Sequence, residues 1–151
     1  MGLDMYLKKN IYIGAHHPHR KIEGAVKLTE NGRPIPIRLD RLMEVTEILG
    51  QWRKANAIHG WFVRNCADGV DDCKSVLVSR KELKALLEIV QEARKAPDKF
   101  HAELPPTEGF FFGRTDDLEW YHQDLARTEE ILTEALKEPG DDFDFYYEAS
   151  W

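Results

Sequence analysis

Two polar residues, Asn56 and His59, interrupt an apolar pattern and are the first candidates for chemistry. In the helix that we predict over 41–66, they lie about one turn apart on the face that carries Trp52 and Phe62. A buried amide or imidazole either forms hydrogen bonds or borders a cavity. An imidazole, with an ordinary pKa of about 6.5, can also transfer protons near neutral pH. The pair therefore indicates a satisfied polar contact beneath a sheet or, alternatively, a functional pocket.

A helix predicted over 115–137 offers partners for such a pocket. Its apolar face carries Tyr121 and Thr128, and Asp124 lies at the edge of that face. A contact between His59 and Asp124 would orient the imidazole as in a catalytic pair, or would be a plain salt bridge. Arg53, which flanks the apolar face of the first helix, would contact a ligand phosphate. The candidate pocket between the two helices consists of Arg53, Asn56, His59, Tyr121, Asp124 and Thr128.

The charge of the chain suggests a second kind of site. The net charge is −6, but residues 103–148 hold 14 acidic residues against three basic ones, a balance of −11. Such a field disfavours direct binding of nucleic acid and favours a partner with a basic surface. The alternative is a solvated helix face without a partner. The candidate acidic surface consists of Asp116, Asp117, Glu119, Glu129, Glu130 and Glu134.

Other residue types allow metal or cofactor sites, but their spacing is typical of none. Cys66 and Cys73 are separated by six residues, which matches no common zinc pattern. Asp71 and Asp72 suit a magnesium ion, and the His16–His19 cluster suits a transition metal despite its tight spacing around a proline. The sequence leaves these two sites open. It holds no phosphate-binding glycine loop and no hydrolase motif, so we expect no metal and no cofactor.

The elements that must position these residues follow from apolar periodicity and turn signals. Asn31 and Gly32 stand between two apolar runs and predict a β-hairpin, and Pro34 and Pro36 favour an edge strand. A second helix is expected to be capped by Ser79 and ended by Pro97. The predicted strands are 3–13, 21–29, 33–39, 76–78 and 143–151. We therefore predict a single α+β domain over 1–151, in which an antiparallel sheet (the N-terminal hairpin plus the C-terminal strand) is packed by about three helices.

Composition bounds the class of protein. The chain has 151 residues, of which 42% are hydrophobic and 32% charged, which is enough for a folded core. No apolar run approaches the ~20 residues of a membrane span, and the N-terminus does not read as a signal peptide. Two cysteines cannot form a disulfide-rich scaffold. We expect a soluble intracellular protein with no membrane contact, whose oligomeric state the sequence does not predict.

Five segments of the chain together resemble a family of small proteins, without assigned activity, that are common in bacteriophage and prophage genomes. The segments are MGLDMYL at 1–7, WRKANAIHGWF at 52–62, DGVDDC at 68–73, GFFFG at 109–113 and FYYEASW at 145–151. The resemblance implies a phage accessory protein acting in the host cytoplasm, and it implies no catalytic residues.

Two functional hypotheses follow. The first is a non-enzymatic phage accessory protein that inhibits a host defence factor, such as a CRISPR effector, by binding a basic host protein through the acidic surface. The second is a small-ligand or nucleotide-signal binding protein, or a hydrolase, with a pocket around Asn56 and His59.

Overall fold

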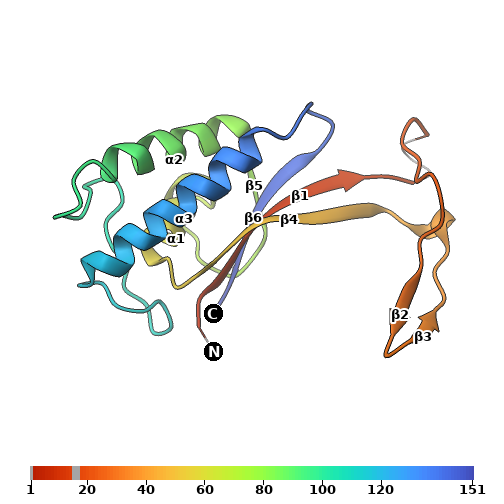
Figure 1. The fold of residues 1–151 in the computed structure, drawn as a ribbon, viewed down its shortest axis with the longest axis horizontal. Coiled ribbons are helices and arrows are strands. Elements are labelled where there is room, and N and C mark those ends of the chain that lie inside the picture. The colour runs from red at the N-terminus through yellow and green to blue at the C-terminus, as the bar shows by residue number, and fades with distance from the viewer. Residues whose placement is uncertain (1, 15–17) are drawn as a thin grey trace.

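The computed structural model describes residues 2–14 and 18–151. These residues form an α+β fold with a four-stranded antiparallel sheet, a separate two-stranded sheet and three α-helices (Figure 1). The main sheet has the order β4-β1-β6-β5, with β4 at Glu44–Arg53, β1 at Asp4–Tyr12, β6 at Asp144–Ser150 and β5 at Val76–Val78. The predicted fold class is confirmed. None of the helices in the described ranges is long and apolar enough to cross a membrane.

The three helices, α1 (Asn56–Cys66), α2 (Arg80–Ala93) and α3 (Leu118–Leu136), pack on one face of this sheet. Alternate residues of β1 and β6 point into the core beneath them, as a strand with one buried face requires. Where α3 crosses β4 the approach is close, since a Cβ atom on Gly50 would meet Ile131 Cγ2 at 2.2 Å. The fully buried side chains at the centre of the core include Met5, Leu7, Ile58, Phe62, Leu86, Leu125 and Leu132.

The helix predicted over 41–66 is wrong in its first half. The structure has a 3-10 turn at Leu39–Arg41, then β4, and only then α1. A β-bulge explains the error, because Leu7 pairs with Gly50 and Lys8 with Ile48, which leaves the residue between them unpaired. Val45 and Ile48 are exposed whereas Leu49 and Trp52 turn toward the core, so the apolar spacing along β4 imitates that of a helix without marking one buried face.

The capping box at Ser79 is confirmed: its hydroxyl accepts from the Glu82 N–H at 3.1 Å, and its own N–H donates to the Glu82 carboxylate at 2.6 Å. Ser79→Ala is expected to lower the free energy of unfolding by about 1 kcal/mol, the usual value of such a cap. Urea denaturation measures the change, with Ser150→Ala, at the exposed end of β6, as a control. Equal stability of both variants would show that this cap does not stabilise the fold.

Residues 13–14 and 18–43 belong to a projection that we name the arm (Figure 1). A hydrogen bond of 2.8 Å from the Ile13 N–H to the Met43 carbonyl closes its base. The predicted hairpin is present, but its strands are shorter than expected, with β2 at Leu28–Glu30 and β3 at Arg33–Ile35. The turn residues Asn31 and Gly32 have φ values of 48° and 77°, as a type I′ turn requires. The arm lies outside the helix-covered part of the sheet.

Candidate functional site

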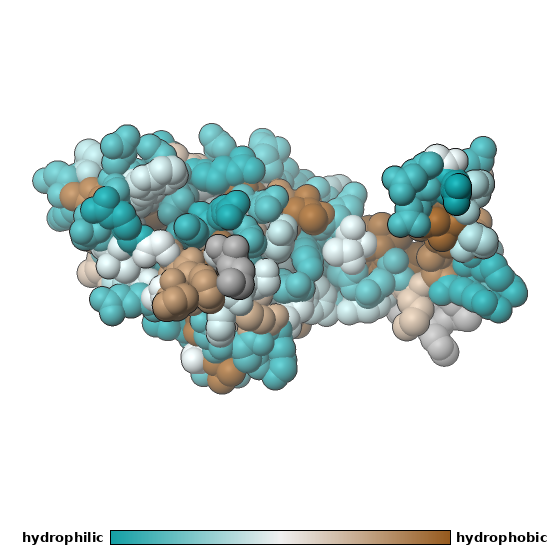
Figure 2. All heavy atoms as spheres, turned by 90° about the horizontal axis from the view of Figure 1, so that it is seen from below, coloured by the Kyte–Doolittle hydropathy of each residue, from teal (hydrophilic) through white to brown (hydrophobic). Residues whose placement is uncertain are grey.

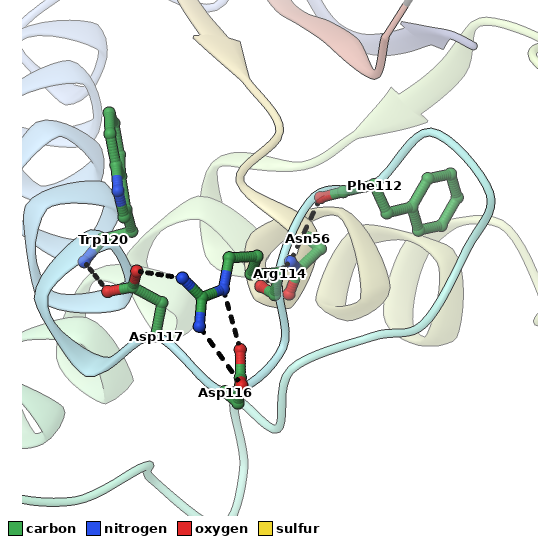
Figure 3. A network of polar contacts seen from close by, with 6 residues as sticks. All are labelled: Asn56, Phe112, Arg114, Asp116, Asp117 and Trp120. Atoms are coloured by element: carbon green, nitrogen blue, oxygen red, sulfur yellow. Dashed lines mark hydrogen bonds and ion pairs between the residues drawn. The ribbon is translucent and has the colours of Figure 1, made fainter.

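A cavity of about 420 Å³ lies between the start of α1 and the first turns of α3. We name it the α1–α3 cavity. Figure 3 shows part of its rim, where the Arg114 guanidinium lies between the carboxylates of Asp116 and Asp117, and the Trp120 ring stands nearby. The lining residues are Arg53, Lys54, Asn56, Ala57, Phe100, Pro106, Gly113, Arg114, Thr115, Asp117, Trp120, Tyr121 and Asp124.

Asn56 builds one wall of this cavity. Its amide nitrogen donates to the carbonyls of Phe112 (3.2 Å) and Arg114 (3.0 Å), and its amide oxygen accepts from the Thr107 N–H at 3.1 Å. The side chain therefore holds the 107–114 loop against the start of α1 (Figure 3). Since these bonds engage both ends of the amide, Asn56 positions the wall and has little capacity left for a ligand.

Tight backbone turns bring the cationic side chains to the same place. Lys54 has a φ of 59°, and Ala55, at φ −75° and ψ 69°, is the centre of an inverse γ-turn in which the Asn56 N–H donates to the Lys54 carbonyl at 2.8 Å. This turn ends β4 and starts α1, and it leaves Arg53 and Lys54 exposed beside the cavity. Two cationic side chains thus stand at the rim.

The apolar wall comes from aromatic residues. The Tyr121 hydroxyl donates to the Leu104 carbonyl at 2.9 Å and accepts from the His101 N–H at 3.0 Å, so it is fully used within the protein. Its ring packs edge-on against Phe100, with centroids 5.0 Å apart. Burial raises the pKa of Tyr121. Trp120 leaves most of its side chain exposed at the mouth, where a flat ligand can stack on it.

Asp124 is the one carboxyl in the described ranges that combines partial burial in this cavity with no side-chain hydrogen bond or ion pair. Burial raises the pKa of Asp124 to about 7. Only its backbone is engaged, because its carbonyl accepts from the Thr128 hydroxyl at 2.6 Å. An unpaired carboxyl in a cavity wall is a group available to a ligand.

Two of the predicted pocket residues lie elsewhere. Thr128 faces the core, where its hydroxyl accepts from Trp52 Nε1 at 2.9 Å. His59 makes no contact with Asp124, so that predicted pair is wrong. The imidazole instead bonds Tyr147 through Nδ1 at 2.7 Å and Asp71 through Nε2 at 2.9 Å. The structure therefore brings together Arg53, Asn56, Tyr121 and Asp124, but not His59 or Thr128.

The hydrogen bonds of His59 belong to a series that runs from Tyr147 through His59 to Asp71 and Trp151. Because a carboxylate only accepts, Nε2 donates to Asp71 and Nδ1 accepts from the Tyr147 hydroxyl. The second oxygen of Asp71 accepts from Trp151 Nε1 at 3.1 Å. Burial raises the pKa of Tyr147 well above its usual value, which keeps the hydroxyl protonated. His59 borders a second cavity of about 450 Å³, but with both nitrogens engaged within the protein and a relative exposure of 1% it has no free nitrogen to offer a substrate there.

The acidic residues predicted as a surface lie on or beside α3, and most are paired. Asp116 and Asp117 contact Arg114, and ion pairs also join Glu129 to Arg94, Glu130 to Arg127 and Glu134 to Lys137. Glu119 accepts a hydrogen bond from Gln123. Five of the six thus have a cation close by, which weakens the field that they present to a partner.

The possible metal ligands are dispersed or engaged. His16 and His17 lie outside the described residues. Asp72 pairs with Lys74, and Asp71 with His59. In the part of the chain that the structure describes, no three His, Cys, Asp or Glu residues form a metal-binding group. Cys66 and Cys73 are free thiols. Burial raises the pKa of Cys66 to about 12, so this thiol is a poor nucleophile.

The fold and the cavity together define an α+β protein whose α1–α3 cavity is lined by cationic, aromatic and carboxyl groups suited to a small ligand. No protein-family model, no curated protein and no solved structure matches this chain. The resemblance to phage proteins stays a prediction from the motifs alone.

Proposed function

We propose that this protein binds a small molecule that joins a flat ring bearing N–H donors to an anionic group, as a nucleotide does. The observation that carries the proposal is the unpaired carboxyl of Asp124 in the wall of the α1–α3 cavity. The volume of about 420 Å³ lies within the range of roughly 300–1,000 Å³ that is usual for ligand sites.

Each part of such a ligand has a counterpart in the cavity. The carboxylate of Asp124 accepts two adjacent N–H groups, which is the pattern on the base-pairing edge of guanine. The exposed Trp120 ring offers a face for stacking. Arg53 and Lys54 stand at the rim, where a phosphate stays close to water. These groups support guanine nucleotides over adenine nucleotides, whose corresponding edge lacks two adjacent donors.

The contacts of His59 favour ligand binding over ligand hydrolysis as the function. A hydrolase would need an acid–base group within reach of the ligand, whereas His59 is enclosed by Tyr147 and Asp71. The ion pairs on α3 favour the cavity over the acidic surface as the primary site. We propose that this binding takes place in the bacterial cytoplasm, which the resemblance to phage proteins implies and where nucleotides are supplied.

Isothermal titration calorimetry with GMP, and AMP for comparison, tests the proposal. GMP is expected to bind more tightly than AMP, and Asp124→Asn to weaken GMP binding by about 10- to 100-fold, the value of a charge-assisted hydrogen bond. Asp141→Asn, whose carboxyl is almost fully exposed, is the control and should bind GMP like the wild type. Absence of binding at millimolar GMP, or unchanged affinity in Asp124→Asn, would refute the proposal.

The pH dependence of ligand affinity gives a second test of the same site. Because the pKa of Asp124 is about 7, the carboxyl is mostly protonated at pH 6 and mostly ionised at pH 8. Guanosine, whose base does not titrate in this range, is therefore expected to bind about tenfold more tightly at pH 8. In Asp124→Asn this pH dependence should vanish.

A further inference from the structure

The arm leaves large apolar side chains exposed. Figure 2 shows hydrophobic residues among hydrophilic ones on this projection, which is joined to the rest of the molecule by a narrow neck. Among the described residues, the large apolar side chains exposed on the arm are Val26, Leu28, Ile35, Leu39 and Met43, and Val45 and Ile48 follow on the adjoining part of β4. Such a concentration marks an interaction surface more often than a scatter of single residues does.

The β2–β3 ribbon has no core of its own. Leu28 pairs with Ile35, so both side chains lie on one face of the ribbon. Every residue of β2 and β3 is exposed, and no helix reaches the ribbon (Figure 1). A two-stranded hairpin is marginally stable in water unless something packs on it. The apolar face of the ribbon therefore needs a surface that residues 2–14 and 18–151 of its own chain do not supply.

The charge of the arm indicates which kind of surface covers the apolar face of the ribbon. Residues 13–43 contain six Lys and Arg against three Asp and Glu, a balance of +3, and the remainder of the chain carries −9. The arm is thus the cationic part of an acidic protein. A nucleic acid would meet repulsion from the rest of the molecule and would leave Leu28 and Ile35 uncovered. A second copy of the chain offers both a complementary charge and protein surface.

We propose that the arm docks on the acidic face of α3 in a second copy of the chain, and that the two arms exchange around a two-fold axis. Glu130 and Glu134, one turn apart and both well exposed on α3, receive Lys27 and Arg33 of the partner's ribbon. The present ion pairs of these two carboxylates are exposed i,i+3 pairs, so exchanging them costs little. A reciprocal contact of this kind closes a dimer and leaves no arm unpaired.

A charge swap tests the dimer by sedimentation equilibrium. The wild type should be a dimer at micromolar concentration, and its dissociation constant should rise with salt. Lys27→Glu/Arg33→Glu and Glu130→Lys/Glu134→Lys should each raise that constant at least tenfold. An equimolar mixture of the two variants should form a heterodimer, because the reversed arm of one variant then meets the reversed α3 surface of the other, and the remaining contact joins a native arm to a native α3 surface. If both variants fold but their mixture does not dimerise, the proposal is overturned.

The apolar contribution has its own test and control. Leu28→Ser/Ile35→Ser should weaken the dimer by at least tenfold, whereas Val70→Ser, an exposed apolar residue outside the arm, should not. Circular dichroism should be unchanged in both, since all three side chains are exposed. A wild type that stays monomeric at 100 μM, or that binds a 20-base-pair DNA duplex through its arm instead, would also overturn the proposal.

Discussion

Asp124→Asn is expected to raise the free energy of unfolding by about 2 kcal/mol at pH 8 and to leave it nearly unchanged at pH 4. The wild-type carboxyl is ionised at pH 8 in a half-buried position without a partner, and an amide removes that charge. A substitution that stabilises the protein while weakening ligand binding would show that this carboxyl is kept for function at a cost in stability.

The direction of this effect follows from proton linkage. The pKa of Asp124 is raised from 3.8 to about 7 by burial, so between these values the folded state binds more protons than the unfolded state. Stability from this group is therefore complete below pH 4 and is lost as pH rises to 7. Each pKa unit corresponds to about 1.4 kcal/mol, and we expect about half of the full value because the carboxyl is partly solvated.

Other carboxyls act in the opposite direction but do not obscure the result. A hydrogen bond from Lys8 lowers the pKa of Glu148, whose stabilising contribution is lost in acid. That group is common to wild type and variant, so the difference between their urea denaturation curves from pH 4 to 8 isolates Asp124. A difference that does not change with pH would contradict the assigned cause.

The sequence predicts the fold class because several elements have local signals that tertiary contacts did not override. The Ser79 capping box, the Asn31-Gly32 turn and the strand at Val76–Val78 are examples. The first half of the predicted long helix fails because its error is not local. The bulge at Leu49 is defined by pairing with β1, and no signal within residues 44–53 reveals it.

In the candidate site, too, the features with a local sequence signal were predictable and those set by contacts between distant segments were not. Asn56 and His59 are buried as predicted, but the predicted apolar face is not the reason, because the first seven residues of α1 are all buried. Asp71 and the 107–114 loop reach them from segments without periodicity, and although Tyr147 lies in a predicted strand, no local signal pairs it with α1. The sequence predicts Asp124 at the edge of an apolar face, and this position is the reason that it is half-buried and lacks a partner.

Asn56→Leu is expected to have the largest effect on stability, a loss of about 3 kcal/mol. A leucine, branched at Cγ like asparagine but unable to form hydrogen bonds, leaves the Thr107 N–H and the carbonyls of Phe112 and Arg114 without partners, and each buried group without one costs about 1–3 kcal/mol. We expect the lower part of the summed range, because the released loop can turn these groups to water. Since the loop forms a wall of the α1–α3 cavity, GMP binding should fall with it.

Two comparisons identify the cause of that loss. Asn56→Asp keeps the acceptor for the Thr107 N–H but sets a carboxylate against two carbonyl oxygens, so it should be as destabilising as Asn56→Leu above neutral pH. Asn65→Ala, at an exposed position of the same helix, should cost less than about 1 kcal/mol. Amide hydrogen exchange should show faster exchange at Thr107 in Asn56→Leu, while Leu83 in α2 keeps its protection. If exchange rises equally throughout the chain, Asn56 stabilises the whole core and does not specifically hold the loop.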